Sequence, residues 1–170
     1  LNLSSHICGG WVREIFHEGK ADIFDFLPMS MFKRVQFNFH GHQHALNIEA
    51  ALNVLKEKFS AYELIFQFDG VNDGIIGMCN NSGLKAYPLF DLSGGAGILP
   101  TEWPIAKGYS GYAGGLSPEN VTHELSRIQK ACNGNTIWVD AETHLRSHED
   151  QLFDMDKVLS FIRNIYSWTI

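Results

Sequence analysis

Short apolar stretches alternate along this chain with longer amphipathic ones, and each stretch ends in Gly, Pro, Asn or Asp. This alternation is typical of strand–helix units repeated along a chain, in which the strands run parallel. Apolar residues at helical spacing are clearest over residues 43–59, 117–131 and 154–168. Ser117 is the expected N-cap of the second helix, with Pro118 in its first position. Strands are predicted over six shorter segments: 1–8, 34–40, 63–68, 84–90, 108–113 and 135–141.

The polarity of the strand faces distinguishes between two parallel-sheet architectures. In the strand at 34–40, apolar Val35, Phe37 and Phe39 alternate with polar residues, and the strand that begins at Glu63 repeats this pattern. A strand buried between the two helical layers of a doubly wound sheet is expected to be apolar on both faces. A barrel accounts for the polar face, because inward residues near the strand ends line an open mouth. We therefore predict an α/β fold, a TIM (β/α)8 barrel of parallel strands alternating with helices, in a single domain over residues 1–170.

The same alternation directs a set of polar side chains at the strand ends toward this mouth. Barrel enzymes carry their binding and catalytic groups at the C-terminal ends of the strands, so we expect these side chains to converge on a ligand site. The expected set is His6, Cys8, Asn38, His40, Gln67, Asp69, Asp91, Asp140 and Glu142.

Three segments, in the same order along the chain, resemble the phosphoribosylanthranilate isomerase family. Residues 112–121 read YAGGLSPENV, close to the GGL-x-PENV signature after that family's seventh strand. Residues 89–97 read LFDLSGGAG and are similar to its sixth strand, where an Asp precedes a GG-x-G loop. Residues 34–41 end in FHG, similar to the QLHG of its fourth strand. The resemblance covers residues 34–168, with 1–7 as the third strand, so the first two βα units of the family have no counterpart and we expect the domain to be incomplete at its N-terminus.

This resemblance implies an isomerase that carries out an Amadori rearrangement, with Asp91 as the general acid that helps to open a ribose ring. The family's general base is a Cys on the first strand, which has no counterpart here. Cys8 or His40 could take that role, and a neighbouring His6 or His40 would have to activate the thiol. His40 is also expected to contact the substrate.

An anion site is expected where a glycine turn precedes a helix. Gly114, Gly115 and the amides that open the following helix could receive a phosphate. The family's Ser-Ser-Gly phosphate loop after the eighth strand is replaced here by residues 141–146. In that loop Glu142 would repel a phosphate unless Arg146 compensates.

Composition narrows the class of partner. The net charge of −6 without any run of Lys or Arg argues against nucleic acid and against an anionic membrane, because both need a clustered positive surface. No apolar run approaches the length of a membrane span. The three cysteines are far apart and odd in number, so we expect reduced thiols and a cytoplasmic protein. A small anionic ligand, a sugar phosphate for example, is the expected partner, with no cofactor and no metal.

Two other functions remain open at this point. A ligand-binding barrel that has lost catalysis would account for the altered loop at 141–146. A metal-dependent hydrolase or lyase could use His6, His40 and an acidic partner, since His40, His42 and His44 alternate along the chain. Six βα units alone would also leave strand edges exposed, and pairing these edges between two chains would give a homodimer.

Overall fold

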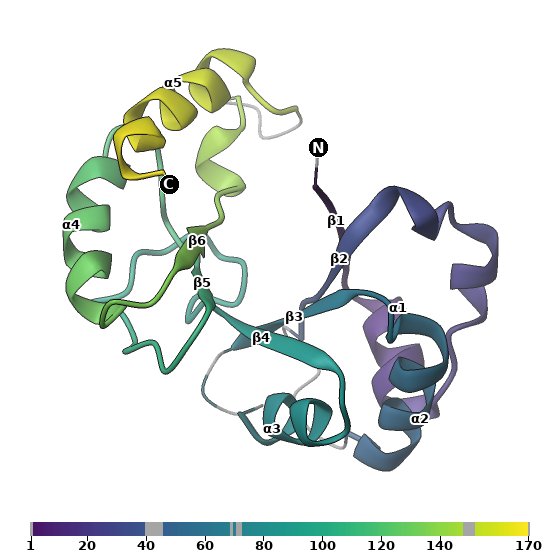
Figure 1. The fold of residues 1–170 in the computed structure, drawn as a ribbon. Helices are drawn as coiled ribbons and strands as arrows, with labels where there is room; N and C mark the ends of the chain where they lie inside the picture. The colour runs from purple at the N-terminus through teal and green to yellow at the C-terminus, as the bar shows by residue number, and fades with distance from the viewer. Residues whose placement is uncertain (1, 40–45, 69, 71–72, 148–151, 170) are drawn as a thin grey trace. The chain divides into compact units, whose positions relative to one another are not determined.

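The computed structural model describes residues 2–39, 46–68, 70, 73–147 and 152–169, and within these ranges six parallel strands alternate with helices (Figure 1). The predicted α/β class is confirmed, and each of the six predicted strands is present. The strands are β1 (Leu3–Ile7), β2 (Phe32–Phe37), β3 (Glu63–Phe68), β4 (Lys85–Phe90), β5 (Ser110–Tyr112) and β6 (Ile137–Val139). The α-helices are α1 (Gly10–Arg13), α2 (Ile48–Phe59), α3 (Asp73–Asn81), α4 (Val121–Ala131) and α5 (Met155–Ile165).

The strands occur in the sheet in chain order, β1-β2-β3-β4-β5-β6. A doubly wound sheet reverses its strand order at a switch point, and this sheet does not. The predicted closed (β/α)8 barrel is not formed by the described residues. Closure requires eight strands with the last paired to the first, whereas the order here is linear with β1 and β6 at its two ends.

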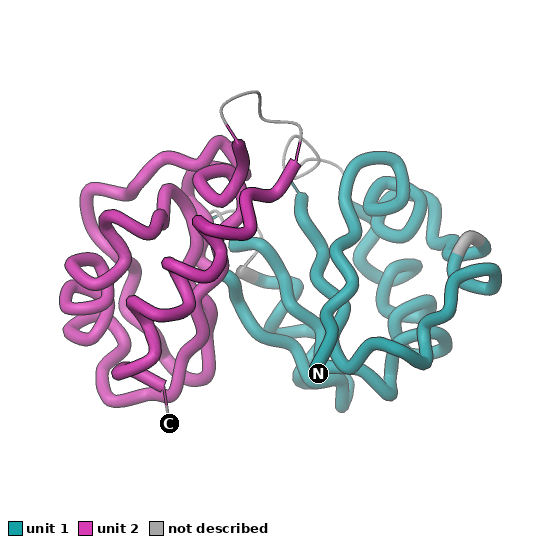
Figure 2. The backbone as a smooth tube through the Cα atoms, turned by 90° about the horizontal axis from the view of Figure 1, so that it is seen from above, with its two compact units in different colours: residues 1–89 teal, residues 90–170 magenta. Residues whose placement is uncertain are grey.

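The chain divides into two compact units, unit 1 (Leu1–Leu89) and unit 2 (Phe90–Ile170), which Figure 2 shows in different colours. In unit 1, parallel pairing places Ile7 beside Phe37 and Phe37 beside Phe66. All three side chains are buried and belong to one apolar cluster. On the other face, Arg34 Nε donates to Glu63 Oε2 at 2.8 Å. The predicted apolar and polar faces of these strands are therefore confirmed.

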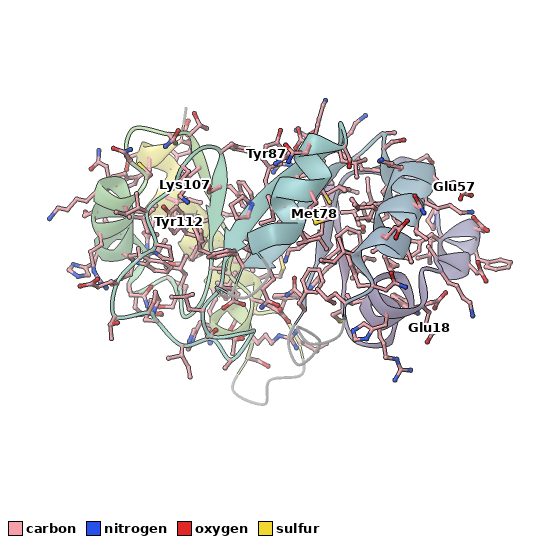
Figure 3. The ribbon with its side chains drawn as sticks, turned by 90° about the horizontal axis from the view of Figure 1, so that it is seen from below. Glu18, Glu57, Met78, Tyr87, Lys107 and Tyr112 are labelled. Atoms are coloured by element: carbon pink, nitrogen blue, oxygen red, sulfur yellow. The ribbon has the colours of Figure 1, made fainter. Side chains whose placement is uncertain are left out.

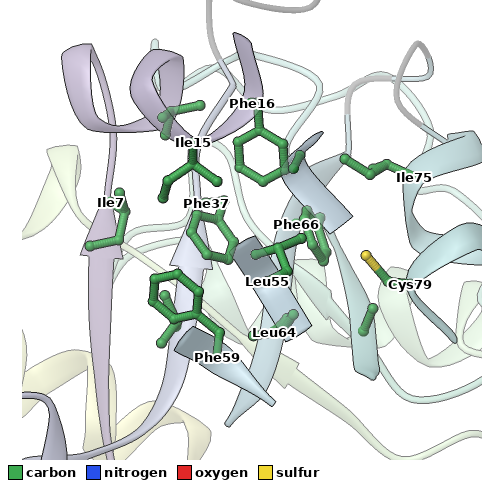
Figure 4. Close-up of a cluster of buried hydrophobic side chains, with 14 of the residues drawn as sticks. Ile7, Ile15, Phe16, Phe37, Leu55, Phe59, Leu64, Phe66, Ile75 and Cys79 are labelled. Atoms are coloured by element: carbon green, nitrogen blue, oxygen red, sulfur yellow. The ribbon is translucent and has the colours of Figure 1, made fainter. Parts of the chain in front are cut away.

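Phenylalanine rings fill the space between the strands of unit 1 and its helices (Figure 4). Phe37 on β2 lies 5.3 Å from the ring of Phe16 and 5.7 Å from that of Phe59 at the end of α2, both edge to face. Phe66 on β3 lies 5.5 Å from Phe37. Aromatic pairs at such distances stabilise a fold by about 0.5–1.5 kcal/mol each beyond the burial of their area.

Four helical segments described in unit 1 were not predicted from the sequence: two 3-10 helices (Asp22–Phe26 and Met29–Met31) and two longer segments. Residues 10–18 form α1 followed directly by a π-helix (Glu14–Glu18), which carries Ile15 and Phe16 into the core. Gly9 before α1 and Gly19 after the π-helix both have positive φ, and this freedom lets the short segment begin and end abruptly. The second of the longer segments is α3, whose Ile75 and Cys79 are buried in the same core.

The helices of unit 2 begin later than the sequence indicates. Helix α4 starts at Val121 with Asn120 as its N-cap, not at Ser117, because residues 117–120 form a turn in which the hydroxyl of Ser117 accepts from the amide of Glu119 at 3.2 Å. Helix α5 begins after Asp154, whose carboxylate accepts from the amides of Asp156 and Lys157. No helix in the described ranges is long and apolar enough to cross a membrane.

A buried carboxylate joins α4 to the segment that precedes β5. Glu124 on α4 is 3% exposed and accepts from Trp103 Nε1 and from Arg127 Nη1, both at 2.8 Å. Trp103 in turn lies edge to face against Tyr112, at 5.7 Å between rings. Tyr112 is fully buried within unit 2 (Figure 3), and its hydroxyl donates to the carbonyl of Pro104 at 2.8 Å. These contacts connect α4 to β5 through the Trp103–Pro104 segment within unit 2.

We predict that only one of the three thiols reacts rapidly in the folded chain. Cys8 is exposed, whereas Cys79 and Cys132 are buried, and burial raises the pKa of Cys79 to about 12. A disulfide reagent at pH 8 should therefore modify one thiol per chain quickly and all three in denaturant, because only the thiolate reacts. Cys8→Ser should remove the fast phase and the control Cys132→Ser should keep it. Rapid modification of two thiols in the folded chain would contradict the burial of Cys79 and Cys132.

Stability is expected to fall in alkaline solution partly through Tyr112. Burial raises the pKa of this phenol to about 12 from its ordinary value of 10. A group whose pKa is higher in the folded state stabilises it fully below the unfolded pKa, so this contribution is constant below pH 10 and is lost between pH 10 and 12. Tyr112→Phe should lower the unfolding free energy by about 1–2 kcal/mol at pH 7, since the Pro104 carbonyl loses its donor.

The same substitution should flatten the alkaline decline measured by denaturant unfolding from pH 8 to 12. Tyr166→Phe is the matched control, because Tyr166 is 77% exposed and its removal should leave the decline unchanged. Equal pH profiles for the wild type and Tyr112→Phe would show that Tyr112 does not cause the decline.

Candidate functional site

The predicted site residues are divided between the two units. In unit 1, His6 on β1 lies beside Gln36 on β2. The Gln36 side-chain amide donates to Asn38 Oδ1 at 3.2 Å, so Asn38 is held at the end of its strand. Gln67 is 2% exposed, and its side-chain oxygen accepts from the amide of Phe39 at 3.0 Å. The side chain of Gln67 thus continues the pairing of β2 and β3 beyond the last backbone partners.

The proposed bases are described only in part. Cys8 and His6 are both exposed at the end of β1, where Cys8 is followed by the Gly9–Gly10 turn into α1. His40 and Asp69 lie outside the described residues, as do His42 and His44. The pairing of His40 with Cys8 therefore stays a prediction.

In unit 2 the structure brings two of the predicted residues together. Asp91 follows β4 and is 6% exposed, and its Oδ1 accepts from the hydroxyl of Ser93 at 2.8 Å and from the amide of Ser93 at 3.2 Å. Gly114 follows β5 with a φ of +100°, and a Cβ added there would lie 3.3 Å from Asp91 Oδ1. A larger residue at 114 would press against this carboxylate, so glycine allows Asp91 to sit at the turn.

The glycine turn at 114–115 is covered by the chain's own loop. A Cβ added at Gly115 would lie 2.8 Å from the carbonyl carbon of Ile98 and would clash with the amide nitrogen of Leu99. The loop is also held at Gly97, whose carbonyl oxygen lies 2.8 Å from a ring nitrogen of His144. Residues 97–99 therefore occupy the space on the side of Gly115 that its missing side chain leaves open.

The amides that open α4 are used within their own turn. Ser117 N donates to Asn120 Oδ1 at 2.9 Å, and Asn120 Nδ2 donates to the Gly115 carbonyl at 2.8 Å. Glu119 N donates to Ser117 Oγ, and the amides of Asn120 and Val121 donate to the Ser117 carbonyl. Pro118 carries no N–H. The amides of Ser117, Glu119, Asn120 and Val121 are therefore already used within the turn.

Charge around the turn is mixed. A hydrogen bond with Ser117 holds the pKa of the exposed Glu119 carboxyl below its usual range, so this group is a carboxylate at neutral pH. Glu142 forms an ion pair with Arg146, and the Arg146 guanidinium lies 5.3 Å from the centre of the Phe153 ring. Arg146 thus offsets the charge of Glu142, as the sequence suggested it would have to. Asp140 follows β6, and its amide continues the ladder by donating to Tyr112 O at 3.0 Å.

Sequence reasoning missed two residues that shape this part of unit 2. His144 holds the loop at Gly97, and Thr143 lies so close to Gly97 that a Cβ there would be 2.9 Å from the Thr143 Cβ. Both residues lie in the 141–146 segment that stands in place of the family's phosphate loop, but neither matches that loop, so the sequence did not single them out. They join the loop after β4 to the segment after β6.

Metal ligands do not cluster within the described residues: no group of three or more His, Cys, Asp or Glu side chains is placed to hold an ion there. The metal hypothesis depends on the alternating His40, His42 and His44, which lie outside those residues, and on His6, which lies within them.

Comparisons with known proteins give no family for this chain. No protein-family model matches it, and neither the curated proteins nor the solved structures contain a match. The fold described above is therefore the most specific grouping that the observations support.

Gly115→Ala should destabilise the chain and loosen the loop. The φ of +71° is strained for alanine, and its Cβ would also meet Ile98 and Leu99. We expect a loss of about 2–4 kcal/mol in the free energy of unfolding. Gly134→Ala is the matched control, because its φ is +76° with nothing within 4 Å of an added Cβ, and it should lose only about 1 kcal/mol. Equal losses in the two variants, measured by denaturant unfolding, would show that the loop does not press on Gly115.

Proposed function

We propose that this chain is a barrel-type protein of the phosphoribosylanthranilate isomerase kind, which binds or isomerises a small anionic, sugar-like ligand at the C-terminal ends of its strands. The observation that carries this proposal is the placement of Asp91, a nearly buried carboxyl group held by Ser93 against the Gly114 turn. The motif that resembles the family's acid and the motif that resembles its phosphate turn are thus adjacent in unit 2.

Strand order supports the barrel-type interpretation. Parallel strands that follow chain order, each joined to the next by one crossover, form the repeating element of a (β/α)8 barrel. Right-handed crossovers, which dominate in proteins, place successive helices on the same side of such a sheet. The opposite side is then free to carry polar groups, and β2 and β3 do so with Arg34, Gln36, Glu63 and Gln67.

Asp91 is the group that would carry the chemistry. An Amadori rearrangement begins when an acid protonates the ring oxygen of the ribose and the C1–O bond breaks, which leaves an iminium ion. A base then removes the proton from C2, and the enol that results becomes the ketone product. The two bonds from Ser93 hold the Asp91 carboxyl in position, and a general acid has to lie within hydrogen-bond reach of the atom that it protonates. The identity of the base stays the prediction made from the sequence, which named Cys8 or His40.

A barrel that binds a ligand without turnover is the second candidate. Loss of the isomerase reaction is favoured because Ile98 and Leu99 cover Gly115 and the amides of residues 117 and 119–121 are used within their own turn, unlike an open phosphate turn. The Glu119 carboxylate, which is hydrogen-bonded to Ser117, also disfavours a dianionic phosphate there.

Measuring the turnover and the binding of phosphoribosylanthranilate by the full chain would distinguish the isomerase from the ligand-binding barrel. We expect turnover, followed by the change in anthranilate fluorescence, and we expect Asp91→Asn to lower it at least about 100-fold because the proton donor is lost. Asp156→Asn, at an exposed carboxylate on α5, should leave the rate unchanged.

Calorimetry with the same compound and with inorganic phosphate completes the experiment. Binding without turnover would favour the second candidate. If neither compound binds and no turnover is detected, the proposed function is wrong.

A further inference from the structure

Helix α5 carries a row of large apolar side chains that face solvent. Met155, Leu159 and Ile162 on the helix and Tyr166 directly after it are 64%, 45%, 51% and 77% exposed. Their spacing of four, three and four residues places them on one narrow stripe, since each residue of an α-helix advances by about 100°. We call these four residues the outer stripe.

A second apolar row on the same helix packs against unit 2. Phe161 is buried, and Val158 and Ile165 are half-buried. Asn164 fixes the helix further by donating to the Pro118 carbonyl at 2.7 Å. The side of α5 that carries Val158, Phe161 and Ile165 is therefore the side that packs against the core of unit 2. The outer stripe is additional apolar surface, and Leu152 and Phe153, which precede the helix, are also exposed, at 74% and 55%.

The charges that border the outer stripe match a second copy of the same helix. Asp156 and Arg163 both lie on the flank away from the buried row, one near each end of α5, and both are exposed. In an antiparallel pair of identical helices related by a twofold axis, equivalent flanks face each other and the ends are reversed. Asp156 of each copy would then lie opposite Arg163 of the other, which gives two ion pairs, each between a carboxylate and a guanidinium.

From this match we propose that the outer stripe is a self-association surface, on which α5 packs antiparallel against α5 of a second copy of the chain. The helix is about 16 Å long, so the contact is small and the dimer is weak, with dissociation in the micromolar range or above. The proposal is independent of the proposed function, because none of its residues belongs to the Asp91 and Gly114 region.

Charge exchange tests both the surface and its orientation. Sedimentation equilibrium over a concentration series should show a monomer–dimer equilibrium for the wild type. Asp156→Arg and Arg163→Asp should each weaken it about tenfold or more, because like charges then meet at both pairs. The double variant D156R/R163D should restore association. A mixture of the two single variants should form a mixed dimer in which all four charges are complementary.

Leu159→Asp should abolish association by placing a charge in the centre of the outer stripe. Ile105→Asp is the matched control, since Ile105 is 71% exposed in unit 2 but lies outside α5, and it should leave association unchanged. Circular dichroism of each variant checks that it is folded. The proposal is overturned if the wild type remains monomeric at all concentrations, which would mean that another partner or segment covers the stripe. It is also overturned if D156R/R163D associates no better than the single variants.

Discussion

In unit 1, the rings of Phe16, Phe37, Phe59 and Phe66 meet in the layer between strands and helices, and the position of each element depends on this contact. Full burial of a large apolar side chain contributes about 1.5–3 kcal/mol, and edge-to-face geometry adds to this. Because residues alternate along a strand, burying Phe37 and Phe66 on one face directs Gln36 and Gln67 to the other. The polar strand face therefore follows from how the apolar face packs.

Polar side chains at the strand ends and turns of both units form hydrogen bonds with the backbone. Gln67 extends a strand pair by accepting from Phe39, and Asn120 both accepts from Ser117 and donates to Gly115. A buried polar group without a partner costs about 1–3 kcal/mol, so strand ends and turns tend to be closed by nearby side chains. A sequence pattern that places polar residues at strand ends identifies candidates for a site, but it does not tell a ligand contact from a structural one.

The sequence was sufficient for features that depend on local period. Alternation over Val35, Phe37 and Phe39 gave β2 and its buried face, because period two is inherent in a strand. The π-helix that carries Phe16 was missed, since a short segment bounded by Gly9 and Gly19 has no helical period to detect. The start of α4 was misplaced because Ser117 and Asn120 bond to each other within one turn, the Asn120 oxygen accepting from the Ser117 amide, so the helix begins only at Val121. Barrel closure depends on pairing between distant strands, which no local pattern records.

The loop over Gly115 bears on how a ligand could reach the glycine turn. Its contacts include the bond between Gly97 and the exposed His144 ring, and one exposed hydrogen bond contributes about 0.5–1.5 kcal/mol. If that bond were the main restraint, an open turn would be less favourable by this amount, and the apparent affinity for a ligand would fall by about 2- to 13-fold. Such a reduction is small beside the range of affinities that ligands show. On that condition the cover over Gly115 weakens binding at the turn without preventing it, and the Glu119 carboxylate beside Ser117 acts against a dianionic ligand there as well.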